Sequence, residues 1–185
     1  MVFLKINIDG AYIIEHEKHQ DERGYFARTF CTRSFSEAGL ESQFVQHSAS
    51  FNKTRGTLRG MHYQSEPCAE VKLVRCARGS IYDVILDLRP QSPTFKQWQG
   101  VTLDEDSGRQ LYIPKGCAHG FQTQTDDVEV HYLISDPYAP EFASGLRFDD
   151  EAFGISWPLD VAVISERDLA WPKFTERVAD TVAGH

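Results

Sequence analysis

The fold of this chain is decided by Val71-Lys-Leu-Val-Arg-Cys-Ala-Arg-Gly-Ser-Ile-Tyr-Asp-Val-Ile-Leu-Asp-Leu88, in the middle of its 185 residues. Residues 71–76 are mostly apolar and are interrupted by Lys72 and Arg75, and residues 80–88 form a short run rich in apolar residues. Both patterns are typical of β-strands. Residues 77–79 end in glycine and predict the turn between the two strands.

Strand patterns continue on both sides of this segment, and helical patterns are few. Further strands are expected at residues 56–64, 100–103, 110–114 and 128–134. Residues 32–40 predict a short helix with a Thr or Ser cap, and residues 165–168 predict one helical turn capped by Ser165. We therefore expect an all-β fold, a barrel of eight or more short strands with small helices at its edges.

The length of the chain predicts one domain, residues 1–185, with a core at about 20–170. The last dozen residues predict a poorly ordered tail or a loosely docked helix. The N-terminal segment from Val2 to Ile8 is a strand that could add to the sheet of a second copy.

Composition excludes several classes of partner. The formal charge of −8 argues against nucleic acid and anionic membranes, because both require a basic face. The four cysteines form no CxxC pair and are expected to be free thiols. The chain has no signal-peptide pattern and no apolar run near the roughly 20 residues that span a bilayer. We expect a soluble cytoplasmic protein.

The segment Arg59-Gly-Met-His62 is the first candidate for chemistry. Glycine inside a strand often marks a bulge or a close backbone approach. With a bulge at Gly60, Arg59 and His62 can face one cavity despite their odd spacing. The alternative is that His62 is an ordinary hydrogen-bonded core histidine.

Lys72 and Tyr132 are the next candidates, each on the apolar face of a predicted strand. Lys72 either extends to the barrel mouth or serves as a fixed cation beside a developing oxyanion. Tyr132 is expected to point into the barrel with Val128, Val130 and Ile134. Its hydroxyl can serve as a core hydrogen-bonding group or as a proton donor in a cavity.

A metal site is the remaining possibility. Residues 114–119 have the pattern PxGxxH, which is half of the metal signature of cupin barrels. A metal cupin also needs an HxH pair, and Gln64 stands where the second imidazole belongs. His62, His119 and Glu70 could form a facial triad, but their spacing does not match. We therefore predict no catalytic metal.

Eight motifs in one order resemble the dTDP-4-dehydrorhamnose 3,5-epimerase family, a group of metal-free cupin homodimers. The resemblance extends from about Asp21 to Asp168, and each motif is weak by itself. The motifs occupy residues 21–26, 56–64, 72–75, 83–89, 92–94, 113–121, 155–158 and 165–168. The resemblance implies a cupin jelly-roll barrel, or double-stranded β-helix, that epimerises C3 and C5 of a nucleotide-linked 4-keto-6-deoxy-hexose without a cofactor.

The resemblance also implies roles for particular residues. His62 would be the general base with Asp168 as its partner, Tyr132 the acid on the opposite face, and Lys72 the cation at the enolate oxygen. The substrate would be bound by residues that contact its diphosphate, sugar or base. These are Arg23, Arg59, His119 and Arg167 at the diphosphate or sugar, Tyr138 stacking on the base, and Gln46 as a polar contact.

The chemistry of these side chains agrees with that set. Removing a proton next to a ketone needs a base with a pKa near neutrality, which suits histidine. It also needs a cation or hydrogen-bond donor at the enolate oxygen, which suits Lys72 or His119. Tyr132 can deliver a proton to the other face. No dinucleotide-binding glycine fingerprint is present, and no redox cofactor is required.

Departures from the family pattern gather in the substrate-binding part. Arg28 replaces a typical Glu, Ser48 stands in a segment that usually has Asn, and Ala143 stands near a typical Glu. We expect Arg28 and Ser48 to contact the substrate. Replacing an acid by Arg28 inverts the local charge and could add a phosphate contact.

Three alternatives to the double epimerase remain. The first is a single-centre 3- or 5-epimerase that acts on a different nucleotide sugar. The second is a metal-dependent cupin isomerase or oxygenase. The third is a sugar-nucleotide binding module that has lost its chemistry, which the presence of His62, Tyr132 and Asp168 opposes.

Overall fold

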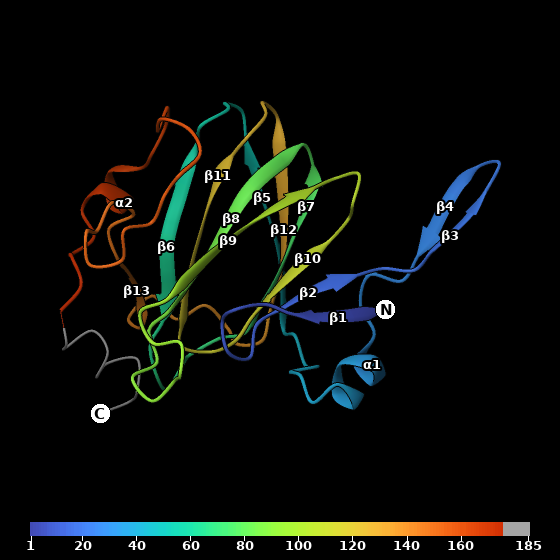
Figure 1. The fold of residues 1–185 in the computed structure, drawn as a ribbon, viewed down its shortest axis with the longest axis horizontal. Coiled ribbons are helices and arrows are strands. Elements are labelled where there is room, and N and C mark those ends of the chain that lie inside the picture. The colour runs from blue at the N-terminus through green and yellow to red at the C-terminus, as the bar shows by residue number, and fades with distance from the viewer. Residues whose placement is uncertain (176–185) are drawn as a thin grey trace.

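The computed structural model describes residues 1–175, and the predicted C-terminal tail therefore lies largely outside the described residues. Two antiparallel sheets face each other and enclose a barrel (Figure 1). The six-stranded sheet has the order β1 (Val2–Lys5), β2 (Tyr12–Glu15), β10 (Gln110–Ile113), β7 (Lys72–Arg78), β12 (Val128–Ile134) and β5 (Gln46–Asn52). The five-stranded sheet has the order β13 (Ala143–Gly145), β6 (Leu58–Gln64), β11 (Cys117–Thr123), β8 (Ser80–Asp87) and β9 (Trp98–Asp104).

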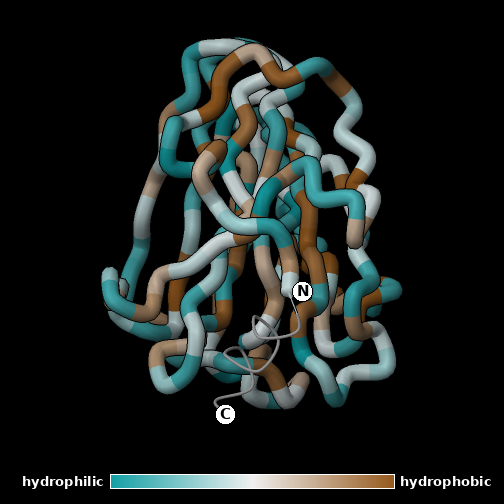
Figure 2. The backbone as a smooth tube through the Cα atoms, turned by 90° about the vertical axis from the view of Figure 1, so that its left-hand side faces the viewer, coloured by the Kyte–Doolittle hydropathy of each residue, from teal (hydrophilic) through white to brown (hydrophobic). Residues whose placement is uncertain are grey.

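The predicted all-β barrel with small peripheral helices is confirmed. Strand β12 has the predicted bounds, and β7 extends two residues past the predicted end, which leaves the turn at Gly79. Hydrophobic and hydrophilic residues are interspersed along the backbone (Figure 2). The apolar core lies between the sheets, where Val74 and Val130 of the larger sheet pack in one cluster with Ile85 and Phe121 of the smaller sheet.

The core begins earlier than the predicted residue 20. Strands β1 and β2 pair with each other, and β2 pairs with β10, so the N-terminal segment belongs to the six-stranded sheet. Ile8 and Ile13 are buried in the core between the sheets. Lys5 and Asn7 interrupt the apolar pattern of the segment, which hid this contribution. In the described chain β1 forms the edge of its sheet, with Val2 and Leu4 exposed.

The two helices lie outside the barrel. Helix α1 (Thr32–Glu37) begins after Cys31, which makes no capping hydrogen bond, so the predicted Thr or Ser cap is wrong. Packing stabilises this helix instead, because Phe35 is fully buried with its ring centroid 4.9 Å from that of Phe30. Helix α2 (Glu166–Leu169) has Ser165 at its N-cap as predicted, with the Ser165 Oγ accepting from the backbone N–H of Asp168.

Strands β3 (Lys18–Asp21) and β4 (Gly24–Ala27) form a separate hairpin that projects from the barrel on the side away from α2 (Figure 1). Within the described residues, neither helix is long and apolar enough to cross a membrane.

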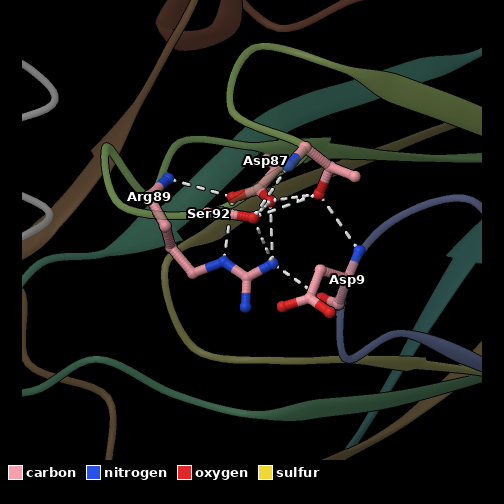
Figure 3. A network of polar contacts seen from close by, with 5 residues as sticks. Asp9, Asp87, Arg89 and Ser92 are labelled. Carbon is pink, nitrogen blue, oxygen red and sulfur yellow. Dashed lines mark hydrogen bonds and ion pairs between the residues drawn. The ribbon is translucent and has the colours of Figure 1, made fainter.

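A buried carboxylate ties the N-terminal segment to the end of β8 (Figure 3). Asp87 accepts hydrogen bonds from the Arg89 guanidinium at 2.8 Å and from the hydroxyls of Ser92 and Thr94 at 2.5 and 2.7 Å. Arg89 in turn donates to the backbone carbonyl of Asp9 at 2.6 Å. Because Asp87 is fully buried, these donors replace the water that its charge has lost.

Candidate active site

Two adjoining cavities share Arg59, His62 and Lys72. The first, about 350 Å³, extends toward α2 and is called the helix-side cavity. The second, about 280 Å³, extends across to the six-stranded sheet and is called the sheet-side cavity. Nine of the twelve predicted site residues line one or both cavities: His62, Tyr132, Asp168, Lys72, Ser48, Arg59, His119, Tyr138 and Arg167.

The backbone around Gly60 makes this arrangement possible, as predicted. Gly60 has φ +135, and the pairing of β6 with β11 shifts register between His119 and Phe121. A Cβ at Gly60 would lie 2.5 Å from the Cα of Gly120, so the two strands approach as only glycines allow. Arg59 and His62 consequently face the same space.

His62 and Asp168 form a hydrogen-bonded dyad at 2.5 Å between His62 Nε2 and Asp168 Oδ1. Strand β6 supplies the histidine, and the capped turn of α2 supplies the carboxylate, which is 4% exposed. Burial by itself would raise the pKa of Asp168, but the hydrogen bond and charge of His62 outweigh burial and lower that pKa. The carboxylate can therefore orient the ring and stabilise its protonated form.

Tyr132 reaches the sheet-side cavity from the opposite sheet. Its ring packs against the apolar core as predicted, and its hydroxyl lies 3.1 Å from the Ser50 Oγ. Burial raises the pKa of Tyr132, opposed by the Ser50 hydrogen bond and reinforced by the charge of Asp83. The hydroxyl therefore keeps its proton at neutral pH and can act as a donor.

Lys72 does not extend into solvent. It is 9% exposed, and its Nζ lies 2.8 Å from the Glu70 Oε1 and 3.5 Å from the His62 carbonyl oxygen. The buried ion pair fixes the ammonium at the junction of the two cavities, which favours the interpretation of Lys72 as a fixed cation. Glu70 was not identified from the sequence as the partner of Lys72, although residues two apart on an extended segment share a face.

His119 stands opposite His62 in the pairing of β11 with β6. Its Nε2 lies 2.6 Å from the Oδ1 of Asp83, which is fully buried on β8. Asp83 was not identified from the sequence, because it lies in an apolar strand 36 residues away from His119. Its carboxylate fixes the orientation of the His119 ring at the cavity.

Several of the residues predicted to bind substrate lie at the rim or walls of the two cavities. Arg59 Nε donates to the Asn52 side-chain oxygen at 2.6 Å. Tyr138 is exposed, and its backbone N–H donates to the Gln46 Oε1 at 2.7 Å, so Gln46 lies behind the rim of the helix-side cavity. Ser48 lines the sheet-side cavity, and Ala143 lines the helix-side cavity.

Arg23 and Arg28 lie away from these cavities in the single chain. Arg23 belongs to the β3–β4 hairpin, pairs with Asp21 at 2.5 Å and has a side chain that is 84% exposed. Arg28 lines a separate hollow of about 150 Å³ together with Glu17 and His19. Neither residue is among those that line the helix-side or the sheet-side cavity.

The three groups of the hypothetical metal triad have separate partners. His62 pairs with Asp168, His119 with Asp83, and Glu70 with Lys72. The Gln64 side chain bonds the backbone of Cys68 and Ala139. Within residues 1–175, no group of three or more His, Cys, Asp or Glu side chains is arranged to hold a metal ion.

Comparisons with known proteins agree with this geometry. Residues 5–176 match the family model described as dTDP-4-dehydrorhamnose 3,5-epimerase. A protein of that name from Methanothermobacter thermautotrophicus is 46% identical over 177 residues, which cover 94% of this chain and 95% of the relative. The match to solved structures confirms the predicted cupin jelly-roll fold.

Two solved structures are informative about the site. The dTDP-6-deoxy-D-glucose-3,5-epimerase of Legionella pneumophila, in complex with dTDP-4-keto-L-rhamnose, has a TM-score of 0.87 and 38% identity, covering 93% of this chain and 92% of that one. A 3'-monoepimerase from Streptomyces bikiniensis, in complex with dTDP-quinovose, has a TM-score of 0.86 and 33% identity, covering 98% of this chain and 89% of that one.

Proposed function

Because this chain belongs to the dTDP-4-dehydrorhamnose 3,5-epimerase family and is an isomerase, we propose that His62 and Tyr132 invert C3 and C5 of dTDP-4-keto-6-deoxyglucose by successive proton transfers. The observation that supports these roles is that the two side chains meet at one cavity from opposite sheets. Inversion requires such an arrangement, because the new proton must arrive on the face opposite to the one that lost its proton.

His62 is the base in this mechanism. A carboxylate only accepts hydrogen bonds, so the proton of the neutral ring is on Nε2, toward Asp168, and the lone pair is on Nδ1. Nδ1 takes the proton from the carbon next to the ketone. The imidazolium that forms is stabilised by the charge of Asp168, and a positioned base of this kind contributes about 10²–10⁴ in rate.

The enolate that remains carries its charge on the C4 oxygen. Lys72 lines the sheet-side cavity and supplies its ammonium for this oxygen. The Nε2 proton of His119 is directed at Asp83, so this ring offers an N–H to the oxygen only in its imidazolium form. One preorganised donor in a site of this kind contributes roughly 3–4 kcal/mol to stabilising the transition state. Tyr132 then gives its hydroxyl proton to the opposite face of the carbon. The tyrosinate regains a proton from solvent, and His62 releases its proton to solvent.

Arg59 and Arg167 line the helix-side cavity, and their guanidinium groups can contact the diphosphate of the substrate. The exposed ring of Tyr138 at the rim can stack on the base. We include Ser48 and Gln46 as polar contacts. Arg23 and Arg28 join the site only in a dimer. The cytoplasmic location expected from the sequence stays a prediction.

A homodimer is part of this proposal. The edge strand β1 exposes Val2 and Leu4, and the projecting hairpin exposes Tyr25 and Phe26, of which Phe26 is 71% exposed. Large exposed apolar side chains on a projecting element are typical of an interface. Sedimentation equilibrium measures the oligomeric state, and a monomer at micromolar concentration contradicts this part of the proposal.

The test of the reaction is proton NMR in deuterated water with dTDP-4-keto-6-deoxyglucose as substrate. Loss of both the C3 and the C5 proton signals supports the double epimerase, since each inversion incorporates solvent deuterium. Loss of one signal identifies a single-centre enzyme, an alternative that the similarity to the Streptomyces 3'-monoepimerase keeps open. Absence of exchange with this and other nucleotide sugars contradicts the proposal.

A further inference from the structure

The carboxylate of the dyad has a second side-chain donor. Trp171 lines the helix-side cavity, and its indole Nε1 lies 3.2 Å from the Oδ1 of Asp168. This is the same oxygen that the His62 Nε2 contacts at 2.5 Å. An indole can only donate, so the two rings share one acceptor.

The indole also lies against the imidazole. The ring centroids of His62 and Trp171 are 6.3 Å apart at an interplanar angle of 67°. The Arg167 guanidinium also lies 5.1 Å from the Trp171 ring centroid, at cation–π distance. Trp171 therefore contacts both a cation and the dyad.

The strand beside His62 leaves room for this ring. Gly145 of β13 is the register partner of His62 on β6. A Cβ at Gly145 would lie 2.6 Å from the Trp171 Cε2 and 2.7 Å from its Nε1. Any larger residue at position 145 would displace the indole or the strand, so this glycine and this tryptophan are matched to each other.

We propose that Trp171 is a positioning residue for the dyad: its N–H fixes Asp168 Oδ1 against His62 Nε2 and weakens the hold of the carboxylate on the protonated ring. This inference rests on the proposed role of His62 as the base. The indole N–H brings a partial positive charge to the shared oxygen. The carboxylate therefore stabilises the imidazolium less than it would alone, and the ring gives up its proton at a lower pH.

Other charged residues also face His62, and Trp171→Phe alters none of them in sequence. Arg59 lies on the same strand, and Lys72 with Glu70 lies beside the cavity. His119 with Asp83 lies on the neighbouring strand, and α2 contributes Arg167 and Asp168. Strand β13 contributes the uncharged Gly145. A difference between variants at position 171 thus isolates the indole.

Trp171→Phe tests the proposal, because it keeps an aromatic ring beside His62 and removes the N–H. Trp157→Phe is the matched control: Trp157 is also half-buried, and its indole donates to a backbone carbonyl, that of Phe148, at 2.9 Å. One readout is the midpoint of the pH titration of the His62 ring protons by NMR, identified by their loss in His62→Asn. The other is the pH dependence of kcat/KM for proton exchange.

For Trp171→Phe, we expect both midpoints to rise by about 0.5 pH unit and the plateau rate to fall severalfold. Trp157→Phe is expected to leave the midpoints and the rate unchanged, even if its melting temperature falls. Midpoints in Trp171→Phe within 0.1 unit of the wild type, as a merely structural role would give, overturn the proposal.

The NMR titration needs no substrate, so the two proposals fail independently. A shifted His62 midpoint without any proton exchange supports the role of Trp171 toward the dyad and contradicts the proposed reaction. Proton exchange together with an unshifted His62 midpoint supports the proposed reaction and contradicts the role of Trp171.

Discussion

His62 and Tyr132 face one cavity from opposite sheets of the barrel, His62 from β6 and Tyr132 from β12. Each has one fixed partner, Asp168 for the imidazole and Ser50 for the hydroxyl. Asp168 is charged and Ser50 is neutral, so the two partners affect His62 and Tyr132 differently. A carboxylate prepares His62 to receive a proton, whereas burial raises the pKa of Tyr132 and keeps the proton on its hydroxyl.

Replacing His62 with alanine is expected to lower proton exchange at the substrate carbon by a factor of about 10³ or more, since the base is lost. Binding of dTDP should change little, because the nucleotide contacts proposed above lie elsewhere in the site. NMR exchange measures the first quantity, and titration calorimetry measures the second. Retention of exchange within tenfold of the wild type would remove His62 from the mechanism.

Tyr132→Phe separates the two proton transfers. The phenyl ring keeps the packing against the core, and only the hydroxyl is lost. We expect proton exchange at carbon to continue, because His62 and the enolate donors remain. Net inversion should fall by a factor of about 10² or more, since the opposite face has no proton donor. Wild-type turnover in this variant would contradict the assignment of Tyr132 as the acid.

Lys72→Met is expected to reduce kcat by a factor of about 10²–10³, the usual cost of one lost donor at an oxyanion. This change also leaves the buried Glu70 without its cation, which destabilises the fold. The double variant Lys72→Met with Glu70→Gln removes that second effect. Activity that returns in the double variant would show that Lys72 acts through folding rather than through the enolate.

The sequence allowed prediction of those parts of the site that depend on strand periodicity or local backbone geometry. Alternation along residues 128–134 predicted that Tyr132 points inward, and the glycine at position 60 predicted that Arg59 and His62 share a face. Ser165 was predicted at the helix cap, and this cap positions Asp168. Each of these features depends on residues that are close in the sequence, so the local sequence pattern predicts it.

The partners that are distant in sequence could not be found in this way. Asp83 and Trp171 approach the two histidines only after β8 pairs with β11 and the segment after α2 folds over β6. The periodicity of a helix or a strand gives no information about residues that are so far apart in the sequence. Arg23 and Arg28 are a different case. Arg23 was assigned by motif resemblance and Arg28 as a departure from the family pattern, and a single chain brings neither of them to the cavities.

The last prediction concerns acid stability and the buried Asp87. Burial by itself would raise the pKa of this carboxyl, but its bonds from Arg89, Ser92 and Thr94 outweigh burial and lower the pKa below the usual 3.8. A group whose pKa is lower in the folded state stabilises the fold above its unfolded value. This contribution is lost as the pH falls through the lower, folded value.

Asp87→Asn removes the charge and leaves Arg89 without its partner. We expect a loss of about 3 kcal/mol in the free energy of unfolding at pH 7, which corresponds to a melting temperature lower by about 6–12 °C. The difference from the wild type should begin to narrow below about pH 4, where the carboxyl of the unfolded chain takes up a proton, and should be lost at the lower pH at which the folded carboxylate is neutralised too. Melting temperatures between pH 3 and 7 measure both effects.

Asp21→Asn is the matched control for this prediction. Asp21 and Arg23 have the same spacing in sequence as Asp87 and Arg89, but their pair lies on the projecting hairpin, in water. Exposed ion pairs contribute little to stability. We expect the melting temperature of Asp21→Asn to equal that of the wild type at every pH. An equal loss in both variants would mean that the buried network at the end of β8 stabilises the barrel no more than a surface pair does.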